Sequence, residues 1–313
     1  MDDPQTTPSD RLPGSRLYPL PVYLHVPCQK ENPINSKAYF QVPWATLIDC
    51  IINLTPDFPK FRIANDFINS LKNDTPSFTI CQTYRFEELI SHFKRLKIDT
   101  VFTPHATKEK KVIDGIKILP FPLFNPLHNE LNSNSPKDLL YSFCGMHRSD
   151  YVSSIRREIF NDNHPKNCEI IERQKWHFDS DVYGNQVGSL QKTQLDDLFS
   201  AINKNEYIDL LNRSRFSLCP GGVGPSSIRF YESLSAGSIP ILISDTMLLP
   251  EIKGLNWDSC IIKIPESDYK DLRGIINNIT PDKEKELREN CIKAYKQVSG
   301  KNFTKCIRDY YEE

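Results

Sequence analysis

The sequence predicts an α/β fold made of two domains, each with a parallel sheet and flanking helices. Apolar strand-like segments alternate with segments of helical periodicity, and this order produces parallel sheets. A stretch rich in proline and asparagine, roughly residues 120–137, interrupts the alternation and predicts a linker. The length of 313 residues is sufficient for two hydrophobic cores of ordinary size.

The part before the linker is the first expected domain, residues 17–130, and it follows a polar, flexible N-terminus of residues 1–16. Apolar runs predict strands at residues 22–26, 38–42, 78–82 and 100–103. Helical periodicity predicts helices at residues 45–54, 62–72 and 86–97. Side chains at the carboxyl ends of parallel strands are expected to contact a ligand. Here they are His25, Trp44, Thr83, Arg85 and His105.

The part after the linker is the second expected domain, residues 137–300. Apolar, β-branched runs predict strands at residues 139–144, 168–171, 216–219, 239–243 and 260–264. Helices are expected at residues 149–160, 226–236, 269–279 and 281–298. The aromatic tail, residues 301–311, predicts one more helix.

A glycine loop between a strand and a helix is the most informative stretch. Pro220 stops the strand, and Gly221, Gly222 and Gly224 let the backbone approach a ligand closely. Pro225 and Ser226 favour a helix start, and the hydroxyls of Ser226 and Ser227 are further donors for an anion. The unbonded N–H groups and the positive end of such a helix favour phosphate. The loop matches neither G-x-G-x-x-G nor G-x-x-x-x-G-K-[ST], so a standard dinucleotide fingerprint and a Walker A loop are both excluded.

Two charged residues of the helix after this loop share one face. Arg229 and Glu232 are three positions apart, so the arginine could pair with a diphosphate while the carboxylate accepts hydrogen bonds from two ribose hydroxyls. The alternative is an intrahelical ion pair on a solvated surface.

The sequence around this loop resembles a known donor-binding signature. It reads Arg-Ser-Arg-Phe-Ser-Leu-Cys-Pro, then Gly-Pro-Ser-Ser-Ile-Arg-Phe-Tyr-Glu-Ser-Leu, then Ala-Gly-Ser-Ile-Pro-Ile. This order is similar to that of the exostosin-like glycosyltransferases. Gly222 departs from the pattern, because many members carry a bulkier or basic residue there.

The resemblance implies a GT-B fold, in which two Rossmann-like domains face a cleft and the last helix, here residues 301–313, crosses back to the first domain. It implies transfer of a sugar from a nucleoside diphosphate sugar, with UDP as the expected nucleotide, to a glycan hydroxyl with inversion. Neither a metal nor another cofactor is expected, since arginines can neutralise the departing diphosphate. The expected donor-binding residues are Arg148, Arg156, Pro220, Gly221, Gly224, Pro225, Ser226, Ser227, Arg229, Glu232, His177 and Tyr183.

Inverting transfer needs a base for the acceptor hydroxyl, and His105, followed by His25, is the candidate because histidine titrates near neutral pH. A strand-end histidine can instead be a structural hydrogen-bonding group. For Arg148 and Arg156 the alternative is a solvated helix surface.

Two other readings of the whole chain stay open. Asp179 and Asp181 form a D-x-D triplet that could hold a divalent cation, as in GT-A enzymes. The second alternative is a catalytically silent carbohydrate-binding or scaffold protein with the same fold.

Composition restricts the partners. The net charge of −1 provides no basic surface for nucleic acid. The sequence contains no run of about 18 apolar residues, so no integral membrane segment is expected. Nine cysteines without a C-x-x-C pair favour a reducing, cytoplasmic environment, and the Asn-x-Ser/Thr triplets are then explained by abundant asparagine. The alternative is a lumenal domain separated from a membrane anchor.

Overall fold

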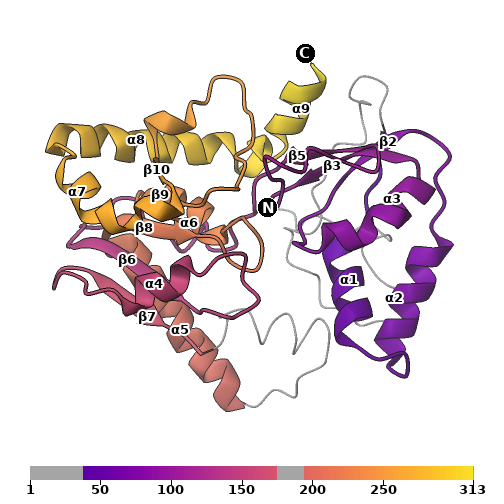
Figure 1. Ribbon diagram of the computed structural model, residues 1–313, viewed down its shortest axis with the longest axis horizontal. Helices are drawn as coiled ribbons and strands as arrows, with labels where there is room; N and C mark the ends of the chain where they lie inside the picture. The colour runs from indigo at the N-terminus through magenta and orange to yellow at the C-terminus, as the bar shows by residue number, and fades with distance from the viewer. Residues whose placement is uncertain (1–37, 175–193, 313) are drawn as a thin grey trace.

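The computed structural model describes residues 38–174 and 194–312, which form two parallel α/β sheets with helices around each (Figure 1). The expected flexible N-terminus and the expected strand at residues 22–26 lie outside the described residues. In the described ranges, no helix has both the length and the apolar composition needed to cross a bilayer.

The first sheet has the strand order β1-β2-β3-β5-β4 and is parallel except for the β4–β5 pair. Its strands are β1 (Ala38–Tyr39), β2 (Ser77–Ile80), β3 (Ile98–Thr103), β4 (Val112–Ile113) and β5 (Ile116–Pro120). Its helices are α1 (Trp44–Asn53), α2 (Pro59–Ser70), the 3-10 turn η3 (Phe86–Leu89) and α3 (Ile90–Arg95).

The second sheet has the order β10-β9-β8-β6-β7, with every neighbouring pair parallel. Its strands are β6 (Leu139–Gly145), β7 (Glu169–Glu172), β8 (Ser214–Pro220), β9 (Ile239–Ile243) and β10 (Ile262–Ile264). Its helices are α4 (Ile155–Asn161), α5 (Gln194–Arg213), α6 (Ile228–Ala236), α7 (Leu272–Asn277) and α8 (Pro281–Gln297). The 3-10 turns are η5 (Trp257–Ser259), η6 (Glu266–Asp271) and η7 (Gly300–Asn302). The chain runs outward from β6 in both directions, so a topological switch point lies between β6 and β8.

Several elements differ from the sequence predictions. The helix α5, which has little apolar periodicity, and the short strands β4 and β5 were not predicted. α4 begins at Ile155 instead of residue 149. Trp44, which the sequence places among the ligand-contacting residues, is instead part of the core and only 1% exposed. Its indole N–H donates to Thr79 Oγ1 at 2.7 Å, and its ring packs edge-on against Phe93 at 5.0 Å.

The last helix, α9 (Lys305–Tyr311), packs on the first sheet although it follows the second sheet in the chain (Figure 1). The Tyr311 ring lies 5.4 Å from Phe78 of β2 and 6.2 Å from Phe102 of β3. Tyr310 also contacts Phe102, at 5.8 Å. Because these rings belong to one buried cluster with the second sheet's core, α9 connects the two halves by apolar packing.

Gly237 ends α6 in the left-handed conformation, as the sequence predicts, with φ of 63°. Its N–H donates to Leu234 O and the Ser238 N–H donates to Ser233 O, which satisfies the last carbonyls of the helix. A Cβ at this position would lie 3.2 Å from the Ser133 Cβ.

We expect Gly237→Ala to lower the free energy of unfolding by about 1–2 kcal/mol, because alanine is strained at this φ. Urea denaturation measures the change. Gly274→Ala in α7 is the matched control, since a Cβ there meets nothing within 4 Å. That control should be neutral or stabilising by up to about 1 kcal/mol. Equal effects of the two substitutions would contradict the cap assignment.

Candidate functional site

The candidate site lies at the switch point, where the loops after β6 and β8 come together. The Val152 N–H donates to Gly222 O at 3.0 Å, which joins the two loops. Within the second loop, the Gly222 N–H donates to Gly224 O at 2.9 Å. Cβ atoms built on Gly145 and Gly222 would lie 3.4 and 3.1 Å from the Arg156 guanidinium, so glycine lets the arginine lie against both backbones.

Arg156 projects from the first turns of α4 under the glycine loop. Its guanidinium donates to Gly221 O at 2.7 Å and to Met146 O at 3.1 Å, and it stacks over the Tyr151 ring at 4.9 Å. Burial and the charge of Arg229 lower the pKa of Arg156 to about 10, which leaves it charged at neutral pH. A solvated helix surface, the alternative for this arginine, is wrong.

Arg229 comes from α6 and reaches the other side of Gly145. It is 8% exposed, donates to Cys144 O, and lies over the Phe143 ring at 4.6 Å and the Tyr207 ring at 5.0 Å. In the described part of the chain, no ion pair joins Arg156 or Arg229 to a carboxylate. Arg156 and Arg229 therefore face one backbone position, and within the described residues their partners are carbonyl oxygens and aromatic faces, not carboxylates.

Glu232 is fully buried one turn further along α6. Its Oε2 accepts a hydrogen bond from the Tyr207 hydroxyl at 2.5 Å, whereas its Oε1 has no partner among the described atoms. Burial raises the pKa of Glu232 to about 7, against the opposing effects of the Tyr207 hydrogen bond and the Arg229 charge. The solvated intrahelical ion pair, the alternative for these two residues, is wrong because both are buried.

The start of α6 has spare donors. Ser227 occupies the N-cap position with extended backbone, but its side chain makes no cap hydrogen bond. The Ser226 hydroxyl is buried and also without a partner in the described structure. The first N–H groups of α6 thus lack the side-chain acceptors that usually cap a helix, which favours an anion at this end.

The first sheet meets this loop from the opposite side. A Cβ on Gly224 would lie 2.4 Å from His105 Nδ1 and 2.9 Å from the Tyr84 Cβ, so the loop touches residues that follow β3 and β2. Burial lowers the pKa of His105 to about 4, although a backbone hydrogen bond to Gln82 acts in the other direction. His105 is therefore neutral, and its buried Nδ1 has no partner in the described structure.

Polar atoms without partners are concentrated around this junction. In the described residues, eight buried side-chain nitrogen or oxygen atoms have no hydrogen-bond partner. Six of them follow strand carboxyl ends or lie on α6: Gln82 Nε2, His105 Nδ1, both ring nitrogens of His147, Ser226 Oγ and Glu232 Oε1. Buried polar atoms are normally satisfied, so this concentration indicates a place for a polar ligand.

The predicted site residues fall into three groups. The structure brings together Arg156, Arg229, Glu232 and the loop residues Pro220, Gly221, Gly224, Pro225, Ser226 and Ser227. Arg148 lies in the same loop after β6, where its exposed guanidinium pairs with Asp150 at 2.7 Å. His25, His177, Tyr183, Asp179 and Asp181 lie outside the described residues.

Sequence reasoning missed His147 and Tyr207. His147 lies two residues after the end of β6, so the rule that selected other strand-end residues also applies to it. Tyr207 lies on the unpredicted helix α5 and carries no local signal. Among the described residues, no group of three or more His, Cys, Asp or Glu side chains is arranged to hold a metal ion.

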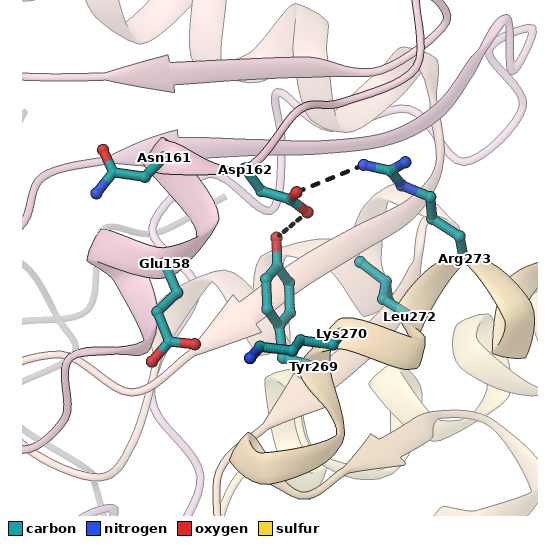
Figure 2. A pocket seen from close by; sticks show the side chains of 7 residues that line it. All are labelled: Glu158, Asn161, Asp162, Tyr269, Lys270, Leu272 and Arg273. Atoms are coloured by element: carbon teal, nitrogen blue, oxygen red, sulfur yellow. Dashed lines mark hydrogen bonds and ion pairs between the residues drawn. The ribbon is translucent and has the colours of Figure 1, made fainter.

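A hollow of about 530 Å³ lies elsewhere, between α4, η6 and α7 (Figure 2). Its lining mixes acidic and basic side chains, and several of them satisfy one another. The Tyr269 hydroxyl donates to Asp162 at 3.3 Å, and Arg273 pairs with Asp162 at 3.5 Å. This mutual pairing contrasts with the unpaired groups at the switch point, so the hollow is not the site.

Comparison with known proteins gives the family. Residues 77–279 match the exostosin GT47 domain. An exostosin-1 homologue of Caenorhabditis elegans is 36% identical over 90 residues, which cover 29% of this chain and 24% of that protein. A probable glucuronosyltransferase of Oryza sativa subsp. japonica is 36% identical over 76 residues, 24% of this chain and 18% of that protein. The matched segments thus span about a quarter or less of these relatives.

The crystal structure of TarM covers 88% of this chain and 59% of its own, with 11% identity and a TM-score of 0.42. The architecture itself is the GT-B arrangement expected from the sequence: two parallel α/β sheets whose carboxyl-end loops meet, with the last helix packed on the first sheet. The matched domain extends over more than half of the chain. The chain belongs to the exostosin GT47 family of glycosyltransferases.

Proposed function

We propose that this chain transfers a sugar from a UDP-sugar to a hydroxyl of a glycan acceptor, with inversion and without a metal ion. The observation that supports it best is the pair of guanidinium groups at the switch point, Arg229 buried and Arg156 partly buried against the glycine loop, because a desolvated cation without a carboxylate is unfavourable until an anion binds. A diphosphate would supply two negative groups to Arg156 and Arg229 and would accept from the start of α6.

The nucleoside would lie along α6, with its ribose hydroxyls donating to Glu232. The free Oε1 supports this assignment, because it is an acceptor that the protein itself leaves unpaired. Tyr207 would hold the carboxylate through Oε2 while Oε1 receives the ribose. The names of the relatives, which include a probable glucuronosyltransferase and a probable beta-1,4-xylosyltransferase, make UDP-glucuronic acid and UDP-xylose the first donors to try.

The chemical step is a single displacement at the anomeric carbon. The acceptor oxygen forms the new glycosidic bond as the bond to the diphosphate breaks, and the diphosphate leaves with the electron pair. His105 Nδ1 would accept the hydroxyl proton. Its pKa of about 4 is low for a base in the free protein, but a bound diphosphate would stabilise the imidazolium and raise this pKa.

We expect Glu232→Ala to weaken UDP binding on the order of a hundredfold, because two charge-assisted hydrogen bonds are lost. Glu232→Gln, which keeps one acceptor oxygen, should lose less. Calorimetric titration with UDP, GDP, ADP and CMP measures the change in affinity caused by each substitution and also the nucleotide preference of the wild type. Glu158→Ala, a helical acidic residue beside the hollow of Figure 2, is the control and should bind as wild type. Unchanged affinity in folded Glu232→Ala would refute the ribose assignment, and no nucleotide binding by wild type would favour the silent carbohydrate-binding alternative.

UDP affinity should also depend on pH through Glu232. The carboxylate accepts both ribose bonds only when it is ionised, and its pKa is about 7 in the free protein. Affinity should therefore fall by up to about tenfold for each pH unit below 7, because binding must then release a proton. The same titration in Glu232→Gln should show a smaller decrease, because only the terminal phosphate of UDP then titrates in this range. A wild-type affinity that does not change between pH 5.5 and roughly 8 would contradict ionised Glu232 as the ribose acceptor.

We expect His105→Ala to lower turnover about a hundredfold or more while UDP affinity stays within about twofold, because the imidazole acts on the acceptor hydroxyl. The rate of sugar transfer should be measured in EDTA, since the proposed reaction needs no metal. Turnover within about threefold of wild type would remove His105 as the base. Loss of wild-type activity in EDTA with recovery in manganese would instead favour Asp179 and Asp181 as a metal site.

A further inference from the structure

Tyr84 lies where the two halves of the molecule meet. It follows β2 by a short turn, in which the Arg85 N–H donates to Thr83 Oγ1 at 3.2 Å and the Phe86 N–H donates to Thr83 O at 3.3 Å. Thr83 is 6% exposed, so the turn has a buried anchor. The Tyr84 Cβ would be 2.9 Å from a Cβ on Gly224, which places the tyrosine directly beside the glycine loop.

The Tyr84 side chain is 38% exposed, and single exposed aromatic residues are common on protein surfaces. This one differs because neighbours fix its ring. Its hydroxyl accepts from Arg85 Nε at 2.9 Å, and its ring meets the His105 ring at 6.4 Å and 80°. Arg85 is itself held near Glu88, at 3.6 Å. The result is a preorganised aromatic surface beside the unpaired His105 Nδ1.

We propose that the Tyr84 ring is the surface on which the acceptor's terminal sugar ring lies, with Arg85 as its positioning residue. The proposal rests on the proposed transfer to a glycan hydroxyl. A pyranose with equatorial substituents has an apolar C–H face whose positive hydrogens match the negative face of an aromatic ring. The hydroxyls at the edge of the sugar ring would lie near His105, whose Nδ1 has no hydrogen-bond partner in the described structure.

This placement separates the two substrates. The donor's diphosphate would lie with Arg156 and Arg229 on the second sheet, whereas Tyr84, Arg85 and His105 all belong to the first sheet. The Gly224 loop lies between the two sets and touches both Tyr84 and His105. Tyr84 should therefore determine which acceptor sugar binds and should have little effect on the nucleotide.

Saturation-transfer NMR tests this without depending on turnover. Methyl β-D-xylopyranoside and methyl β-D-glucopyranoside serve as probes in the presence of saturating UDP. We expect saturation of C–H protons on one sugar face with wild type, at least about fivefold weaker sugar binding with Tyr84→Ala, and a loss of only about threefold with Tyr84→Phe, which keeps the ring. UDP affinity should not change. Phe58→Ala is the matched control, because Phe58 is another exposed aromatic residue of the first half, at 47% exposure.

Arg85→Gln tests the positioning role. It should weaken sugar binding about threefold when Tyr84 is present and have no further effect in Tyr84→Ala, since Arg85 acts through the ring. Equal losses in both backgrounds would refute that role.

The outcomes separate this proposal from the proposed function. The proposed role of the Tyr84 ring would be wrong if Tyr84→Ala bound the sugar as tightly as wild type does, or if wild type bound UDP but gave no sugar signal. Either result would leave the proposed donor site unaffected. Absence of UDP binding by wild type would overturn the proposed function, and the sugar signal would still report on Tyr84.

Discussion

The arrangement of the second half depends on two guanidinium groups that share one glycine. Arg156 and Arg229 come from helices on either side of the switch point, and a Cβ on Gly145 would lie 3.4 Å from one and 3.5 Å from the other. Like charges this close repel, and burial removes the water that would screen them. The protein offsets this with backbone carbonyl dipoles and the negative faces of aromatic rings, which carry no net charge and leave the positive charge in place. The site is therefore built around an uncompensated positive charge.

The same constraint explains the glycines around the pair. A Cβ at Gly222 would lie 3.1 Å from the Arg156 guanidinium, one at Gly145 would lie 3.2 Å from the Phe143 ring, and one at Gly224 would collide with His105. Glycine at these positions serves close approach, because none of the three has a positive φ. Gly222 is the clearest example, because a Cβ there would lie 3.1 Å from the guanidinium of Arg156, which comes from α4.

Sequence reasoning was most successful where the pattern is local. The strand at Ile239–Ile243, the glycine cap at Gly237 and the start of α8 at Pro281 are found where the apolar run, the glycine and the proline predict them. The sequence did not predict α5, because this helix has little apolar periodicity and is held by tertiary contacts. Tyr207, which lies on α5, was therefore missed as well. The burial of Glu232 could not be predicted either, because it depends on how α5 packs over α6. The expected roles of the site residues remain predictions.

The return of α9 to the first sheet has a consequence for synthesis on the ribosome. Phe78 and Phe102 emerge early, yet the tyrosine that packs against both of them is Tyr311. At a usual elongation rate, the ~200 residues between Phe102 and Tyr311 take roughly 10–40 s to add. During that interval the nascent first half displays an unfinished aromatic surface, which is a binding site for chaperones and a hazard for aggregation. Burial of Phe78 and Phe102 is thus completed only after α9 has been synthesised.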